Sequence, residues 1–560
     1  MTKKKMSTRE HGLGRQAAAV CGGLLLGLLG ADAARAEQAQ VVRNVETFAP
    51  VQAFVLNVDL RTLPKAPDWQ PGDPIKEIPR RATKVTPSVP EPPPMEDPLR
   101  ARPAAPKAPT AIGPPILNFN GGGFSGVNPP DTVGDIGLNH YIQLINFGSG
   151  SQMRIYDKAG TLVAGPIALD SLGAPAPCNA GLGDPIVLWD QLANRWLVSE
   201  FSSAGNRMCV YISQTTDPVA GGWFGYAFQG VNFPDYPKYG VWPDAYYVGT
   251  NESTAAAYAF QRSQMLVGAA AAAQRFSVLP PLSGFAFEGI QPADADGALP
   301  PPAGSPGMFW RHRDSEAHGS PGAPDTVQYY EFDVDFAVPA NSTFTGPIDI
   351  PVTEFDSSLC GLTSFNCFPQ PGGGPLLDPL REPIMHRAQY RNRGTHEVVL
   401  GSFVIDVTGT NVGGVRWFEA RKTGGGPYTL FQEGTVSPDN TNRWMSSIAM
   451  DGSGNIALGY NVVNAATATF PGLRYTGRVS TDPPGTMAAE QLIIAGSASN
   501  GSNRYGDYSS LNVDPVNECT FWWTGEYNPA TQWSTRIATF TFPVPECIPV
   551  PVSLQGFVVE

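Results

Sequence analysis

Charged residues are scarce in this chain of 560 residues: they make up 16% of it, whereas soluble domains have about 25%. Long heptad stretches are missing, because 61 glycines and 55 prolines interrupt the sequence, and this excludes a coiled coil. The glycines lack a period of three, which excludes collagen. Basic residues are outnumbered, and the net charge of −13 argues against a nucleic-acid partner.

Several catalytic and metal-binding motifs are also absent from the sequence. The serine-hydrolase pattern GxSxG, the zinc-protease pattern HExxH and the phosphate loop GxxxxGK[ST] do not occur. No CxxC or paired Cys/His spacing suits zinc. No nucleotide or redox cofactor is therefore predicted, and Ca²⁺ is the one metal that the acidic residues discussed below could hold.

The N-terminus has the three-part pattern of a secretory signal peptide. Basic residues between 3 and 15 precede an apolar run at 17–29, and the small-residue site Ala34-Arg35-Ala36 follows. We predict that residues 1–36 are removed and that the protein is secreted. No later apolar run approaches the roughly 20 residues of a membrane-spanning helix, so no membrane span is predicted.

The cysteines fit an oxidising compartment, because loss of Cys21 leaves six, an even number that predicts three disulfides in an exported chain. Neighbours in the sequence suggest the pairs Cys178 with Cys209, Cys360 with Cys367, and Cys519 with Cys547.

The composition divides the chain into further segments. Residues 37–60 form an N-terminal arm, whose apolar patch is either a strand docked on the main body or part of a disordered arm. Residues 61–115 contain many prolines and predict a semi-rigid polyproline linker. Globular composition extends over 117–545, and 546–560 is a C-terminal tail.

The globular region reads as all-β, with apolar runs of strand length and helical spacing only within 255–276. A unit of acidic or Asn-rich turn, strand, turn and aromatic strand restarts seven times, a repeat typical of a seven-bladed β-propeller. A pair of β-sandwiches is the alternative. The longest gap between openings holds Cys360, Cys367 and a Pro-Gly turn, which we interpret as an inserted loop. The seven openings lie near 130–135, 183–190, 235–244, 291–294, 385–387, 442–444 and 503–507.

Four strings resemble secreted bacterial propeller proteins of largely unassigned function that are loosely sialidase-like. The resemblance covers roughly 117–545 and implies a propeller and export to the extracellular space or periplasm, without implying an activity. The Ser-x-Asp-x-Gly-x-Thr-Trp box of true sialidases is missing, and 451–455 is only a faint echo of it. The strings are PDTVGD at 130–135, DPIVLWD at 184–190, YPK at 236–238 with VWPD at 241–244, and DYSS at 507–510 with CTFW at 519–522.

Three arginines, Arg387, Arg443 and Arg504, occupy equivalent places at the openings of three successive repeats. If these openings begin innermost strands, the guanidinium groups would meet at one mouth of the channel and bind a carboxylate, sulfate or phosphate. Sialidases bind a sugar carboxylate with such a cluster, so an acidic glycan is the ligand that the resemblance implies. Alternatively, each arginine pairs with an acidic residue of a neighbouring blade.

Aspartates occur at four of the openings, the last of which also holds Arg504: Asp131, Asp184, Asp235 and Asp507. Carboxylates around a channel could bind Ca²⁺, act as a catalytic pair, or cap turns by accepting backbone hydrogen bonds. Aromatic residues such as Trp189, Trp242 and Trp310 could stack on sugars or pack between blades.

These observations lead to two functional hypotheses. The first is a secreted binding or scaffold module whose channel mouth binds an anionic glycan or an extracellular protein. The second is a sialidase-like glycoside hydrolase or a polysaccharide lyase. It would use the three arginines for the substrate carboxylate, Asp184 or Asp235 as acid, and Tyr505 or Tyr390 as nucleophile. Whether the protein is an enzyme stays open at this stage.

Overall fold

Short strands and tight turns account for nearly all of the described chain, as the run lengths and turn residues predict. The computed structural model describes residues 39–80, 93–100, 108–172, 176–282, 288–361 and 364–544. The predicted signal peptide and C-terminal tail lie outside these ranges. Within them, the one α-helix, α1 (Arg262–Met265), is a single turn inside the 255–276 stretch.

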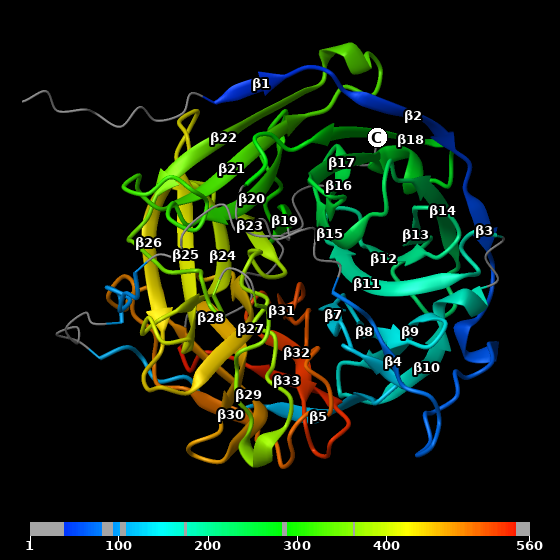
Figure 1. Ribbon diagram of the computed structural model, residues 1–560. Coiled ribbons are helices and arrows are strands. Elements are labelled where there is room, and N and C mark those ends of the chain that lie inside the picture. The colour runs from blue at the N-terminus through cyan, green and yellow to red at the C-terminus, as the bar shows by residue number, and fades with distance from the viewer. Residues whose placement is uncertain are drawn as a thin grey trace, which may run out of the picture. The chain divides into compact units, whose positions relative to one another are not determined.

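The strands form a seven-bladed β-propeller, which confirms the predicted fold class and rules out the sandwich pair (Figure 1). Each blade begins with its innermost strand, and these strands contact one another in a closed order: β7, β11, β15, β19, β23, β27, β31 and again β7. Each predicted opening lies at the start of one of these strands. Blades 1 to 3 comprise β7 (Val133–Ile136), β8 (His140–Phe147), β9 (Gly150–Asp157) and β10 (Leu162–Ala168); β11 (Gly181–Asp190), β12 (Arg195–Ser202), β13 (Arg207–Ser213) and β14 (Trp223–Gln229); β15 (Asp235–Val241), β16 (Ala245–Asn251), β17 (Ala255–Gln261) and β18 (Ala271–Ser277).

Blades 4 and 5 are joined directly, because β19 and β23 pair in parallel from Ala293 with Ala388 to Asp296 with Arg391. Their innermost strands therefore run in the same direction. Blades 4 to 7 comprise β19 (Gln291–Asp296), β20 (Gly307–Arg313), β21 (Thr326–Asp333) and β22 (Thr343–Pro351); β23 (Ala388–Asn392), β24 (Glu397–Asp406), β25 (Gly413–Lys422) and β26 (Thr429–Val436); β27 (Asn442–Met450), β28 (Ile456–Asn464), β29 (Thr469–Arg478) and β30 (Gln491–Ile494); β31 (Ser510–Val513), β32 (Phe521–Tyr527) and β33 (Ser534–Phe540).

The seventh blade is completed by a strand from before the first blade. The outer edge of β33 pairs with β5 (Leu117–Gly123), with Ile537 opposite Phe119. Hydrogen bonds within this sheet therefore hold the first and last strands of the ring together. As the fourth strand of blade 7, β5 covers the outer edge of β33.

The N-terminal arm is docked, which is the first of the two alternatives for its apolar patch. Three short strands, β1 (Gln40–Val42), β2 (Glu46–Val51) and β3 (Phe54–Leu56), pair with β22, β18 and β14. They add a fifth strand to blades 4, 3 and 2 (Figure 1). The arm therefore covers the exposed edges of three neighbouring blades.

The described parts of the proline-rich segment also contact the propeller, which a free spacer would not do. After η1 (Leu60–Thr62), β4 (Lys76–Glu77) pairs in parallel with β6 (Val127–Asn128). Further along, the carboxylate of Asp97 accepts a 2.5 Å hydrogen bond from Arg416 on β25, and both side chains are buried. Two polar anchors thus fix this segment to the ring.

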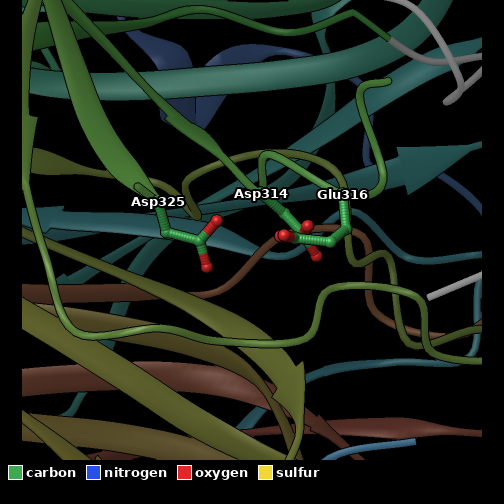
Figure 2. Close-up of side chains that lie close together, drawn as sticks. All are labelled: Asp314, Glu316 and Asp325. Carbon is green, nitrogen blue, oxygen red and sulfur yellow. The ribbon is translucent and has the colours of Figure 1, made fainter. Parts of the chain in front are cut away.

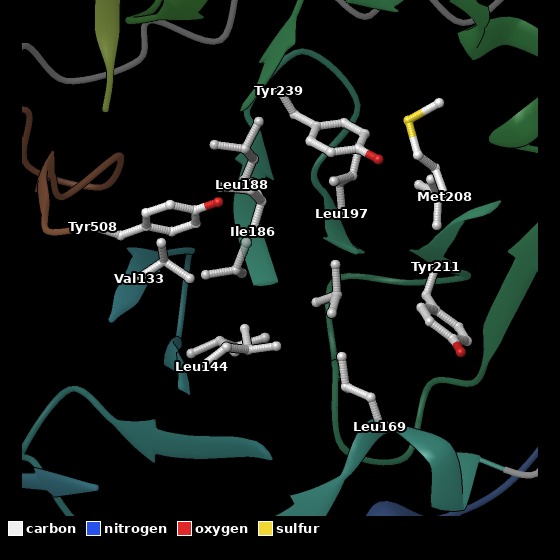
Figure 3. Close-up of a cluster of buried hydrophobic side chains, with 14 of the residues drawn as sticks. Val133, Leu144, Leu169, Ile186, Leu188, Leu197, Met208, Tyr211, Tyr239 and Tyr508 are labelled. Carbon is white, nitrogen blue, oxygen red and sulfur yellow. The ribbon is translucent and has the colours of Figure 1, made fainter. Parts of the chain in front are cut away.

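The core consists of apolar layers between blades. Figure 3 shows one such layer, in which Val133 and Leu144 of blade 1 lie with Ile186 and Leu188 of blade 2. Because both faces of a blade are covered, every residue of β24 is buried and its sequence reads as a continuous run instead of an alternating one. The remaining short helices are η2 (Leu169–Leu172), η3 (Pro339–Asn341) and η4 (Pro371–Gly373).

Two of the three predicted disulfides are confirmed. Cys178 bonds to Cys209 on β13, and Cys360 bonds to Cys367 in the insertion between blades 4 and 5. The third predicted pair includes Cys547, which lies outside the described residues.

Candidate functional site

The channel has two chemically different ends. The first residues of the innermost strands gather at one end, which we call the opening end. The hairpins that join each innermost strand to the second strand of its blade gather at the other, which we call the hairpin end.

A repeated backbone conformation explains the aspartates at the opening end. Five blades begin with a residue in the left-handed region: Asp131 (φ 47°), Asp184 (φ 53°), Tyr236 (φ 52°), Met445 (φ 48°) and Asp507 (φ 56°). Aspartate tolerates this conformation better than most residues do. The backbone thus accounts for aspartate at three openings, independently of any chemistry.

These openings surround a buried amine. Lys238 Nζ lies 3.3 Å from the ring centroids of Tyr236 and Tyr508. Burial lowers the pKa of Lys238 to about 7, against the opposing effect of Asp184 and other carboxylates. Burial and the charges of Asp184 and Asp507 raise the pKa of Asp131 well above its ordinary value. The opening end therefore combines carboxyl groups whose pKa values are raised with an amine whose pKa is lowered.

The opening end is closed to ligands of the size of a sugar. Residues Ile78, Pro79 and Arg80 of the proline-rich segment cover it, and the void beneath them, beside Asp184 and Asp235, measures about 20 Å³. A single water molecule needs roughly 10–15 Å³ measured in this way. The void therefore holds about one water molecule and no substrate.

The structure places Arg387 in a buried ion pair. Its Nη1 donates to Asp294 Oδ2 at 2.6 Å, and its Nη2 donates to Asp296 Oδ2. The side chains of Arg387 and Asp294 are 1% and 3% exposed, so water does not screen this pair. Arg387 thus joins the innermost strand of blade 4 to the start of blade 5.

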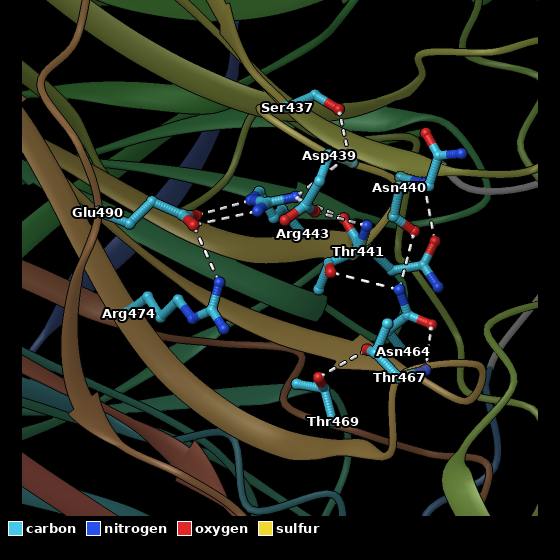
Figure 4. A network of polar contacts seen from close by, with 12 residues as sticks. Ser437, Asp439, Asn440, Thr441, Arg443, Asn464, Thr467, Thr469, Arg474 and Glu490 are labelled. Atoms are coloured by element: carbon cyan, nitrogen blue, oxygen red, sulfur yellow. Dashed lines mark hydrogen bonds and ion pairs between the residues drawn. The ribbon is translucent and has the colours of Figure 1, made fainter.

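Arg443 is bound within blade 6, as Figure 4 shows. Its Nε and Nη2 donate to the two carboxylate oxygens of Glu490 at 2.7 and 3.0 Å, and its Nη1 donates to Asp439 at 3.0 Å. Burial raises the pKa of Glu490, but the hydrogen bonds and charge of Arg443 outweigh it, and the net pKa is lowered. Arg443 is therefore already engaged with carboxylates.

Arg504 is the predicted arginine that reaches the opening end. It donates to both oxygens of Asp507 at 3.1 and 2.5 Å, and its Nε donates to the Ile78 carbonyl at 3.0 Å. On its outer side lies a 780 Å³ cavity bounded by Ile78–Arg80, the insertion and loop 501–504. No carboxylate partner is shared among Arg387, Arg443 and Arg504 in the described ranges.

The tyrosines of the hydrolase hypothesis are occupied. Tyr505 donates to the Glu526 carbonyl and Tyr390 donates to the Glu397 carboxylate, at 3.2 and 2.8 Å. Burial raises the pKa of both phenols. Neither is prepared to lose its proton to a substrate.

The hairpin end holds another cavity, similar in size to the one beside Arg504, and sequence reasoning missed it. Its volume is about 810 Å³, within the range of ligand pockets. All seven blades contribute to its lining, so the cavity is the mouth of the channel itself. The contributions in blade order are Leu138; Gln191, Leu192 and Asn194; Pro243 and Arg262; Gly297–Pro300; Arg391–Arg393; Gly452 and Ser453; and Pro515–Cys519.

Arginines outnumber carboxylates in this lining by three to one. Arg262 pairs with Asp190 at 2.7 Å, and Arg391 pairs with Glu518 at 2.6 Å. Arg393 donates only to the carbonyls of Asp451 and Gly452, at 3.4 and 2.5 Å, and no carboxylate in the described chain pairs with it. Of the three lining arginines, Arg393 is therefore the one whose charge is not balanced by an ion pair within the described chain.

A separate group of acidic residues lies on the loop between β20 and β21 (Figure 2). Asp314, Glu316 and Asp325 each offer one oxygen, and these oxygens lie within 4.8 Å of one another. Among the described residues, this group is the one that could hold a cation; the opening aspartates do not form one. Backbone N–H groups already donate to Asp314 and Asp325, so these carboxylates organise the loop.

We expect Asp325→Asn to change the pH dependence of stability. Burial and the charge of Asp314 raise the pKa of Asp325 to about 8. The native state therefore keeps a proton that the unfolded chain releases near pH 4, and wild type loses stability as pH rises from about 4 through 8. The variant lacks this loss, which is at most about 1.4 kcal/mol per pH unit. Urea unfolding at pH 5, 7 and 9 measures the difference, and identical profiles for variant and wild type would contradict it; Asp333→Asn, exposed on the same hairpin, is the control.

Comparisons with known proteins find no relative by sequence and several solved structures of low similarity. No protein-family model matches the chain, and no curated protein matches its sequence. Similar solved structures include the WD40 domain of SCAP from fission yeast, with 11% identity, 78% of this chain and 98% of that chain covered, and a TM-score of 0.32. An endo-arabinase from Bacteroides thetaiotaomicron has 13% identity, 54% and 95% coverage and a TM-score of 0.27. A GH62 α-L-arabinofuranosidase from Coprinopsis cinerea has 11% identity, 64% and 90% coverage and a TM-score of 0.27. Likenesses this distant carry no argument about function.

No helix in the described ranges has the length and apolar character needed to cross a membrane.

Proposed function

We propose that this protein is a secreted binding module whose propeller channel takes an anionic ligand at the hairpin end. The observation that carries the proposal is Arg393, which lines an 810 Å³ cavity without a carboxylate partner among the described residues. A guanidinium group suits a carboxylate, sulfate or phosphate. The signal-peptide pattern and two disulfides support an oxidising compartment outside the cytoplasm.

The hydrolase hypothesis has less support. It requires three arginines that are available to a substrate carboxylate, but Arg387, Arg443 and Arg504 each bind carboxylates of the chain itself. It also requires room beside Asp184 or Asp235, where the void measures about 20 Å³. The roles of these residues as ligand contacts stay a prediction, and their contacts favour a structural role.

Equilibrium binding of carboxylates tests the proposal. We expect glucuronate, glucuronate oligomers or free carboxylic acids to bind wild type more tightly than their neutral analogues do, with affinity that falls as salt is added. Arg393→Ala should weaken binding at least tenfold. Arg43→Ala, at an exposed arginine of the N-terminal arm outside the cavity, should leave binding unchanged.

If no carboxylate binds better than its neutral analogue, or if Arg393→Ala binds as wild type does, the hairpin cavity is not the anion site.

A further inference from the structure

Anion binding by Arg393 does not explain why apolar side chains line the hairpin cavity. Leu138, Leu192, Leu299 and Val516 come from four different blades and face one cavity. Leu299 and Val516 are 48% and 57% exposed. Large aliphatic side chains gathered at a concave site and left in contact with water indicate a surface that a ligand covers.

The same cavity lacks the features that a glycan would use. None of its described lining residues is aromatic, so a sugar ring finds no flat apolar face to stack on. The tryptophans that could have served are buried between blades: Trp189, Trp242 and Trp310 are at most 4% exposed. They cannot reach a ligand in the channel mouth.

The amide side chains in the lining are also largely engaged with the protein. Gln191 donates to Glu518 at 2.9 Å and accepts from the Gly297 N–H at 3.1 Å. Asn392 donates to the Pro300 carbonyl at 2.7 Å and accepts from the Gly394 N–H at 2.9 Å. These amides therefore offer little to the many hydroxyl groups of a sugar, while the arginines remain suited to a single charged group.

We propose that the hairpin cavity binds an amphiphilic carboxylate with an aliphatic chain. The headgroup lies against Arg393, and the chain covers Leu138, Leu192, Leu299 and Val516. This inference rests on the proposed function and names its ligand class: one negative charge and a flexible apolar body in place of an acidic glycan.

The experiment compares four probes by isothermal titration on the full mature chain: decanoate, decanol, hexanoate and glucuronate. We expect decanoate to bind at least tenfold more tightly than decanol, because decanol lacks the charge. It should also exceed hexanoate by at least tenfold, because the shorter chain covers fewer apolar side chains. Glucuronate should bind weakest of the three carboxylates.

Two variants separate the contributions of the headgroup and the chain. Arg393→Ala should reduce the affinity for decanoate at least tenfold. Leu299→Ser with Val516→Ser should reduce it several-fold while leaving hexanoate nearly unchanged. Both leucine and valine are exposed, so the fold should tolerate these changes. Leu492→Ser, 55% exposed on β30 and outside the cavity, is the matched control.

The outcomes are distinguishable. Glucuronate binding that depends on Arg393, with decanoate no tighter than hexanoate, would overturn the aliphatic ligand and leave the anion-binding module standing. Decanoate and decanol binding equally would overturn both, because the charge would then contribute nothing. Decanoate binding that the Leu299 and Val516 variant does not change would place the chain elsewhere and overturn this inference alone.

Discussion

Arg387→Ala should lower the free energy of unfolding by about 3–5 kcal/mol, the cost of removing one partner from a buried ion pair. Without the guanidinium group, Asp294 keeps only the 2.9 Å hydrogen bond from the Val241 N–H. Burial then raises the pKa of Asp294 without the opposing charge of Arg387. Urea unfolding at pH 7, followed by tryptophan fluorescence, measures the loss.

Two further variants make this result interpretable. Arg387→Lys keeps the charge but loses the fork that spans Asp294 and Asp296, so its loss should be intermediate. Arg61→Ala breaks an exposed pair with Asp59 and should cost far less than Arg387→Ala, because water screens the exposed charges. If Arg387→Ala were as stable as wild type, Arg387 would not have a structural role. A ligand-binding role for Arg387, Arg443 and Arg504 would then be supported.

Replacing Cys178 and Cys209 with serine should destabilise the protein by about 3–4 kcal/mol. The bond closes a loop of 31 residues between the turn before β11 and β13, and a cross-link of this span restricts the unfolded chain by about that amount. Both cysteines are buried, so the loss should appear even where no ligand is bound.

Thermal unfolding with and without reductant measures the effect. Wild type in reductant should approach the double variant, and the variant itself should not respond to reductant at this site. Because Cys360 and Cys367 enclose a much shorter loop, serine at both of those positions should cost less. Equal losses for the two pairs would contradict the loop-closure argument.

The sequence was sufficient for the architecture of the ring. The seven openings were recognisable because an acidic or Asn-rich turn precedes the apolar run of an innermost strand, and at five of them, such as Asp184, a left-handed residue begins the strand. The closing strand β5 was not foreseen, because its alternation is confined to Leu-Asn-Phe-Asn and three glycines, which are unfavourable in strands, complete it. The strand β5 is held by pairing with the outer edge of β33, and these two segments meet only when the ring is closed.

The site was harder to predict, for a physical reason. Sequence position showed that Arg387, Arg443 and Arg504 occur at equivalent openings, but side-chain direction depends on the acidic residues of adjacent strands. Asp294 and Glu490 are distant in sequence and capture Arg387 and Arg443. Arg391 and Arg393 were overlooked although they follow Arg387 closely. The available signal was the string Arg391-Asn392-Arg393-Gly394, which places one cation near the end of β23 and a second in the turn that follows.

The closure of blade 7 affects when this protein can become folded. Asn118 on β5 and Arg536 on β33 are 418 residues apart and hydrogen bond to each other. A contact between such distant residues forms slowly, since most of the chain must be ordered before its two ends can meet. During synthesis, β5 is made early, but it cannot pair with β33 until nearly the whole chain has been made. The native ring therefore cannot close until its C-terminal blade has been made.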